Sequence, residues 1–133
     1  MAIAISRTLL DQIQSIAAAD RAEVFGLLFG TAERIAAIAP AANVAPDPAR
    51  HFELDPAALI AAHRAARAGG PPIIGHYHSH PSGVAVPSAT DTACAAPDGS
   101  LWLIVAAGEA RLWVAQGDGA GGVCFAPTTL QVV

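Results

Sequence analysis

Strand-length apolar runs alternate along this chain with segments of helical periodicity. The strand-like runs include "EVFGLLFG", "PPIIGHYHSH", "SLWLIVAAG" and "EARLWVAQG". Leucine and isoleucine recur at helical spacing in "RTLLDQIQSIAAA", which Ser6 can cap. "DPAALIAAHRAARAGG" has Asp55 as N-cap, Pro56 at the first helical position and Gly69 beyond the end. This order predicts an α/β or α+β fold, in which helices flank a mixed sheet.

A hairpin, a short helix and two closing runs complete the expected fold. "EVFGLLFG" and "RIAAIAPAANV" are joined by a short polar turn and predict a hairpin, in which Pro40 indicates an edge position or a bulge. "SATDTACAA" predicts a short helix. After the glycine-rich loop "GDGAGG", the runs "GVCFA" and "LQVV" are expected to finish the sheet.

Length and composition exclude several classes of protein. The 133 residues fit one domain, residues 1–133, and the net charge of −4 argues against nucleic acid as a partner. No apolar run approaches the roughly 20 residues of a membrane span, and the N-terminus does not resemble a signal peptide. Cys94 and Cys124 form no C-x-x-C pair. We therefore expect a protein of a reducing compartment, the cytoplasm.

Histidines alternate in the strand-like run "GHYHSH". Side chains on a strand alternate between its faces, so His78 and His80 point the same way with Cα atoms roughly 6.5–7 Å apart. Two imidazoles at that spacing can bind one ion. His76 lies about 13 Å from His80, which makes it a neighbour of such a site and not a ligand. An isolated H-x-H also occurs by chance in many chains.

A third ligand is needed, and Asp91 is the best candidate, eleven residues beyond His80. The segment Ser88–Asp91 also fits a capping box, with Ser88 as N-cap and Asp91 at the third helical position. The two interpretations are compatible. Two histidines and one carboxylate leave a fourth position open, as catalytic zinc sites do.

Hydrolysis at such a site needs a carboxylate near the metal to accept a proton from water. Glu33 and Glu109 fall at hairpin turns and Glu53 at a strand end, which are solvent positions. Glu23 instead precedes the apolar run "VFGLLFG", where a buried carboxylate requires a partner. A solvated glutamate at a strand end remains the alternative.

These residues resemble the JAMM, or MPN-plus, metalloprotease family. Its signature is a remote Glu, then H-x-H, seven residues, S, two residues, D. The chain matches it with Glu23, His78, His80, Ser88 and Asp91 at the expected spacing. The flanks "EVFGLLFG" and "GHYHSHP" are also similar to the family's E-x-x-G-x-L-x-G and G-x-Y-H-S-H-P.

The resemblance implies one zinc ion per chain, held by His78, His80 and Asp91 together with a water. Glu23 would be the general base, and Ser88 would donate a hydrogen bond to the developing oxyanion. The implied fold is a single MPN-type domain, which resembles the cytidine-deaminase-like fold. The family cuts after the C-terminal Gly-Gly of ubiquitin or ubiquitin-like proteins. The short chain resembles minimal prokaryotic members that process small β-grasp proteins, including sulfur carriers.

A nucleoside deaminase and a catalytically silent scaffold are the alternative functions, and a homodimer is a possible assembly. A zinc nucleoside deaminase would need H-x-E and P-C-x-x-C, and the chain has neither. A catalytically silent MPN-type scaffold or protein-binding module would have lost signature residues, whereas all five are present. A mean hydropathy of +0.45 leaves a homodimer open.

Overall fold

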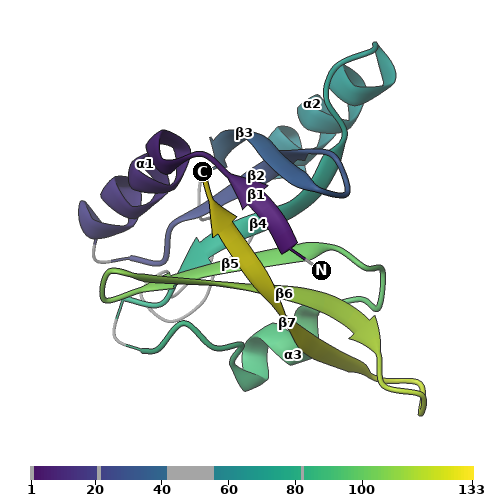
Figure 1. Ribbon diagram of the computed structural model, residues 1–133. Helices are drawn as coiled ribbons and strands as arrows, with labels where there is room; N and C mark the ends of the chain where they lie inside the picture. Colours follow the sequence, from purple (N-terminus) through teal and green to yellow (C-terminus); the bar gives the residue numbers. More distant parts are fainter. Residues whose placement is uncertain (1, 21, 42–55, 82) are drawn as a thin grey trace.

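The computed structural model describes residues 2–20, 22–41, 56–81 and 83–133 (Figure 1). Along the chain its elements are β1 (Ala2–Ile5), α1 (Arg7–Ala18), β2 (Phe25–Gly30), β3 (Arg34–Ala41), α2 (Pro56–Arg67), β4 (Ile73–Ser79), α3 (Ala89–Cys94), β5 (Leu101–Ala106), β6 (Glu109–Gly117) and β7 (Val123–Val132). The expected cap of α2, Asp55, lies outside the described residues. None of the described helices is long and apolar enough to cross a membrane.

The strands form one mixed sheet in the order β1-β3-β2-β4-β5-β6-β7, which confirms the predicted class. β4 and β5 run parallel, and hairpins join β2 to β3 and β5 to β6. β1 pairs in parallel with both β3 and β7, so the sheet closes into a barrel. This closure joins the two ends of the chain and has no local sequence signal, so the sequence did not predict it.

The two proline-containing strands differ in how well they were predicted. Pro40 pairs with Gly26 of β2, while β1 reaches β3 only at Arg34 and Ile35, so Pro40 has the predicted edge position. The two runs expected to finish the sheet both lie in its last strand, β7, which was not predicted to run unbroken from Val123 to Val132. Its Pro127 pairs with β6, and β1 joins β7 only from Thr129 onward. The strand tolerates the proline because one of its sides is still unpaired there.

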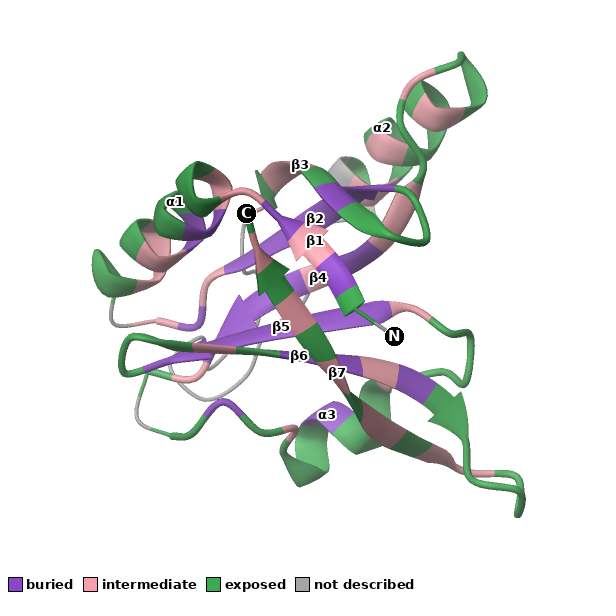
Figure 2. Ribbon diagram, viewed as in Figure 1, coloured by how far each residue is buried: buried purple, intermediate pink, exposed green. Residues whose placement is uncertain are grey.

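The two faces of the sheet bury different residues. α1 covers one face, where Leu10 and Ile13 pack with Tyr77 of β4 and Leu103 of β5. The ring of Tyr77 lies across Gly26, where a Cβ would overlap it. The opposite face carries two smaller apolar clusters, one that includes Ala62 of α2 and one that packs against Ala95, just beyond α3. Figure 2 shows β2 and β5 buried over their whole length.

Strand alternation then separates the residues of β4. Tyr77 belongs to the core beneath α1, so its neighbours His76 and His78 point to the opposite face. There His76 lies between the rings of Phe25 on β2 and Trp102 on β5, and the His78 ring packs edge-on against Trp102. The fold thus sets two histidines on the outer face of a buried strand.

Candidate metal centre

Two histidine rings meet at the end of β4. His78 is fully buried, and His80, the first residue after the strand, is partly exposed. The backbone N–H of His80 donates to the carbonyl of Val105, which continues the pairing with β5. The Nε2 atoms of the two rings lie 3.1 Å apart. They therefore converge as the H-x-H spacing predicts.

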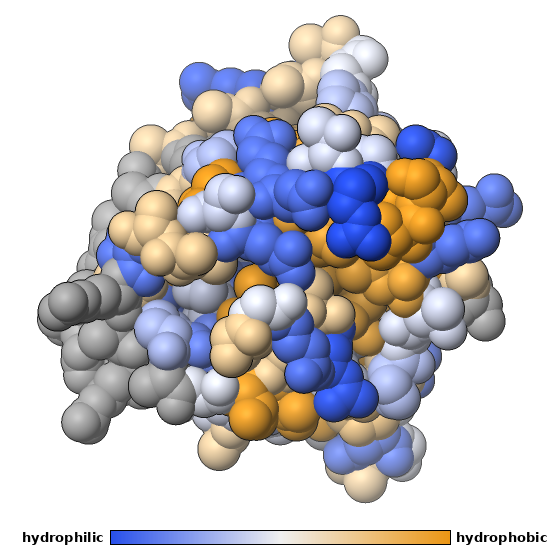
Figure 3. All heavy atoms as spheres, turned by 60° about the vertical axis from the view of Figure 1, so that its left-hand side comes forward, coloured by the Kyte–Doolittle hydropathy of each residue, from blue (hydrophilic) through white to orange (hydrophobic). Residues whose placement is uncertain are grey.

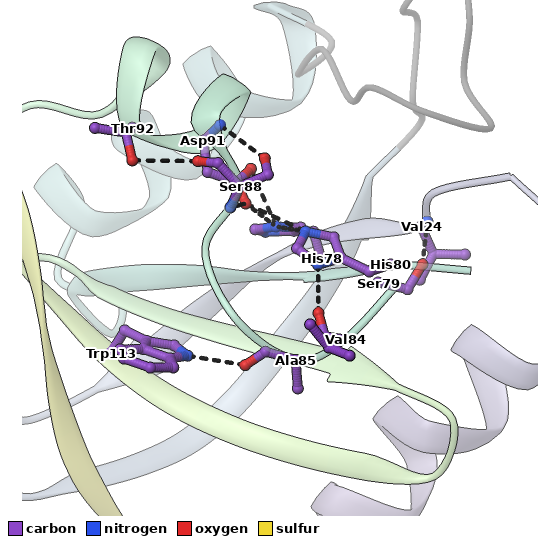
Figure 4. A network of polar contacts seen from close by, with 10 residues as sticks. All are labelled: Val24, His78, Ser79, His80, Val84, Ala85, Ser88, Asp91, Thr92 and Trp113. Atoms are coloured by element: carbon purple, nitrogen blue, oxygen red, sulfur yellow. Dashed lines mark hydrogen bonds and ion pairs between the residues drawn. The ribbon is translucent and has the colours of Figure 1, made fainter. Parts of the chain in front are cut away.

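Asp91 reaches the same point from the first turn of α3 (Figure 4). Its Oδ2 lies 3.4 Å from His78 Nε2 and 3.2 Å from His80 Nε2. In a tetrahedral zinc site with bonds of about 2.0–2.1 Å, neighbouring donor atoms are about 3.3–3.4 Å apart. The three atoms thus have the mutual separations that one small tetrahedral ion requires.

Asp91 also belongs to the predicted capping box, which the structure confirms. The Ser88 hydroxyl accepts a hydrogen bond from the Asp91 backbone N–H at 3.1 Å, and Asp91 Oδ2 accepts one from the Ser88 N–H at 2.9 Å. The carboxylate is therefore held by its own helix. Since Ser88 Oγ is the acceptor in this bond, its hydroxyl hydrogen stays available for donation toward the site.

Glu23 lies beside this cluster, and only 4% of its surface is exposed. A carboxylate oxygen of Glu23 and one ring nitrogen each of His78 and His80 lie within 4.8 Å of one another. Ser79 holds the segment in place, because its hydroxyl accepts from the Val24 N–H at 2.9 Å and its N–H donates to the Val24 carbonyl at 3.1 Å. Glu33 and Glu109 are exposed, as expected, and Glu53 lies outside the described residues.

The surroundings favour the protonation state that a cation requires at Asp91 and His78, and oppose it at His80. Burial alone would raise the pKa of Asp91, but hydrogen bonds with His78 and His80 outweigh it and hold that pKa well below its usual range. Burial lowers the pKa of His78, against the opposing effect of Asp91. The hydrogen bond with Asp91 raises the pKa of His80. The site therefore offers a carboxylate at Asp91 and a neutral His78, whereas the raised pKa of His80 makes a metal compete there with a proton.

His76 is placed differently. Its ring stacks on Phe25 at 5.1 Å and meets the edge of Trp102 at 4.3 Å between centroids. Burial, followed by the neighbouring His78, lowers its pKa to about 3, so the ring is neutral. It lies 5.6 Å from the His78 ring and packs against it without joining the donor cluster. The sequence interpretation overlooked this aromatic frame, although the pairing of β4 with β5 sets Trp102 directly opposite His76.

Two cavities adjoin the histidines. One of about 660 Å³ lies beside His76 and is bordered by Leu59 of α2 and the loop at Gly99. The other, of about 500 Å³, lies beside His80, between the end of α1 and the turn at Gly108. Figure 3 turns the left-hand side of Figure 1 forward and shows apolar side chains gathered between polar ones on that face.

Part of the chain is similar in sequence to two known proteins. The chain is 41% identical over 85 residues to the desampylase of Haloferax volcanii, covering 62% of this chain and 61% of that protein. It is 39% identical over 69 residues to the "Probable TtuB-protein conjugate cleaving protease" of Thermus thermophilus, covering 52% and 46%. The chain thus matches roughly half to three fifths of the length of these relatives.

Solved structures show the same fold. A protein of Desulfitobacterium hafniense superposes with a TM-score of 0.78 at 25% identity, over 100% of this chain and 94% of the other. A JAB1/MPN domain protein of Archaeoglobus fulgidus gives 0.60 at 21% identity, over 99% and 98%. The model of the family described as prokaryotic homologs of the JAB domain matches residues 6–116. This chain therefore belongs to the prokaryotic branch of the JAB, or JAMM, family.

Proposed function

We propose that this protein is a zinc-dependent peptidase or isopeptidase that hydrolyses the bond after the C-terminal Gly-Gly of a ubiquitin-like or sulfur-carrier β-grasp protein. The observation that supports it most directly is the convergence of His78, His80 and Asp91 donor atoms, 3.1–3.4 Å apart, beside the buried carboxylate of Glu23. Structural zinc sites fill all four positions with protein atoms, whereas three protein ligands favour a catalytic site.

In this proposal His78, His80 and Asp91 hold one zinc ion per chain. Two imidazole nitrogens and a carboxylate oxygen are ordinary zinc ligands. When bound, the ion lowers the pKa of a water at the open position to about 7 and polarises a substrate carbonyl. The capping bond from the Ser88 N–H fixes the Asp91 carboxylate before any metal arrives.

Glu23 and Ser88 would move the proton and orient the substrate. Glu23 takes a proton from the attacking water and delivers it to the amine nitrogen as the C–N bond breaks. Its carboxylate is buried and lies within 4.8 Å of the ring nitrogens of the two histidines, close enough to the proposed metal for that exchange. Ser88, whose oxygen already accepts from Asp91, would donate its hydrogen to the oxygen of the reacting carbonyl.

The substrate class rests on the resemblance and on the relatives. The names of both relatives refer to small protein modifiers, one by its removal and the other by cleavage of its conjugates. A Gly-Gly tail has no side chains, so it can thread a narrow groove where other residues would clash. We therefore favour trimming or release of a β-grasp tail by a single domain comprising residues 1–133.

The decisive experiment incubates zinc-loaded protein with small β-grasp proteins that carry residues beyond Gly-Gly, as linear extensions and as isopeptide conjugates. Mass spectrometry of the products identifies the bond that is cut. We expect cleavage after Gly-Gly by the wild type and none by Glu23→Gln. Zinc-bound wild type that cuts neither form would contradict the proposal and favour the scaffold.

Two accompanying expectations concern location and assembly. The thiols of Cys94 and Cys124 are free and exposed, which supports the proposed reducing cytoplasm. A homodimer stays a prediction, and sedimentation at several concentrations tests it.

A further inference from the structure

Ala85 anchors the loop that joins β4 to α3. Within Gly83–Pro87, the Ala85 side chain is only 2% exposed and packs in the cluster that contains Trp102 and Trp113. Its neighbours Val84 and Val86 are 68% and 38% exposed. The Ala85 carbonyl accepts a hydrogen bond from Nε1 of Trp113 at 3.2 Å (Figure 4). The path of the loop is thus determined at Ala85.

The adjacent carbonyl holds a candidate metal ligand. Nδ1 of His80 lies 2.7 Å from the oxygen of Val84, which also accepts from the Val86 N–H at 2.8 Å. A carbonyl can only accept, so Nδ1 of a neutral His80 must carry the hydrogen. Nε2 then presents its lone pair toward Asp91 and His78. Ala85 and Val84 are consecutive, so a shift of the first carbonyl moves the second.

Trp113 is itself held firmly. It pairs with Trp102 of β5 and with Pro127 of β7, and only 9% of its surface is exposed. The Arg111 guanidinium covers its ring at 5.2 Å. The indole N–H therefore offers the loop a fixed point on β6, a strand that supplies none of the proposed ligands.

We propose that Trp113 is a positioning residue: through the Ala85 carbonyl it places the Val84 carbonyl, and so sets the ring orientation and tautomer of His80 for metal binding. The inference rests on the metal-binding part of the proposed function and is independent of the substrate. A carbonyl that accepts from the second ring nitrogen of a ligand histidine, as Val84 does from His80, fixes the ring before the metal binds and raises the metal affinity of the site.

The first test is Trp113→Phe, which removes the N–H and keeps an aromatic ring. Zn²⁺ and Co²⁺ affinities are measured by competition with a chromophoric chelator, and the Co²⁺ absorption spectrum reports ligand geometry. We expect metal binding to weaken by about tenfold, the lower end of the range for such partners. Val123→Ala trims the same apolar cluster and serves as the packing control, because Val123 packs against it without that hydrogen bond. Equal loss of affinity in both variants would overturn the proposal.

A double-mutant cycle shows whether the effect passes through His80. In a His80→Ala background, Trp113→Phe should leave the remaining metal affinity unchanged, because the ring that it positions is gone. A further tenfold loss in that background would mean that Trp113 acts on the whole site through packing, and would overturn the assignment.

A measurement on the wild type covers the case in which Trp113→Phe does not fold. Nitrogen NMR of zinc-free protein, at a pH where His80 is neutral, should show its hydrogen on Nδ1. Hydrogen on Nε2 would overturn the proposal. Failure of this proposal can be told apart from failure of the peptidase function. If Trp113→Phe weakens metal binding through His80 in a protein that cleaves nothing, the positioning role alone is supported. If the protein cleaves but Trp113→Phe does not affect metal binding, the peptidase function alone is supported.

Discussion

One oxygen of Asp91 serves both helix α3 and the candidate metal centre. Oδ2 accepts from the Ser88 N–H at 2.9 Å and lies 3.2 Å from Nε2 of His80. The first turn of α3 therefore cannot move without moving the carboxylate. With a metal bound, this coupling would make the stability of helix α3 depend on the ion, and the geometry of the centre depend on the helix cap.

Replacing Asp91 by Asn should strongly reduce the stabilisation by zinc. A ligand at 100 times its Kd stabilises the native state by about 2.7 kcal/mol, or roughly 10 °C in Tm for a chain of this length. Asn keeps a side-chain oxygen for the Ser88 N–H and removes the charge, so the zinc-free Tm should change much less. Thermal melts with and without zinc measure both. A full zinc response in Asp91→Asn would remove Asp91 from the ligand set.

Replacing Glu23 by Gln should separate metal binding from cleavage. The variant keeps the shape of the side chain and loses its ability to accept a proton, so zinc content should equal that of the wild type while kcat falls by about 10²–10⁴-fold. Metal analysis and the cleavage assay are run on the same samples. The matched control is Glu33→Gln, at an exposed turn, which should cleave normally. Wild-type rates in Glu23→Gln would exclude Glu23 as the base.

Ser88 is predicted to act in two ways that one pair of variants distinguishes. Ser88→Ala removes the cap and the oxyanion donor, and should lower the free energy of unfolding by about 1 kcal/mol. Ser88→Gly loses the same donor but, as an acceptable N-cap, should lower stability by only a few tenths of a kcal/mol. Both should reduce kcat by about 10²–10³-fold with little change in KM. If kcat instead falls in Ser88→Ala and stays near the wild-type value in Ser88→Gly, as the stabilities do, the hydroxyl serves only as a cap.

Tyr77 should make the protein sensitive to alkaline pH. Its hydroxyl is buried with no hydrogen-bond partner among the described residues, and burial raises its pKa from 10.0 to about 12. A raised folded-state pKa contributes stability that is complete below pH 10 and is lost as the pH rises toward 12. The loss relative to Tyr77→Phe should reach about 2–3 kcal/mol, measured by urea unfolding. Parallel pH profiles for the two proteins would contradict this expectation.

Much of the site could be predicted because its signals are short-range. Alternation along β4 sets His78 and His80 on a common side, and the spacing of Ser88 and Asp91 encodes a capping box that forms within one helical turn. Apolar periodicity and glycine or proline boundaries likewise located most strands and helices. Each of these signals depends on residues only a few positions apart, so the local backbone conformation determines how their side chains lie.

Other features were decided only by the tertiary structure. Glu23 reaches the histidines because β2 pairs with β4 in a register that sets Phe25 opposite His78, 53 positions later in the chain. The barrel closes because β1 pairs with β7. The loop at Ala85 is anchored by a hydrogen bond from Trp113 on β6. Such contacts depend on which register buries the most apolar surface across the whole sheet. No local sequence pattern determines that register, because it depends on the packing of strands that are far apart in the sequence.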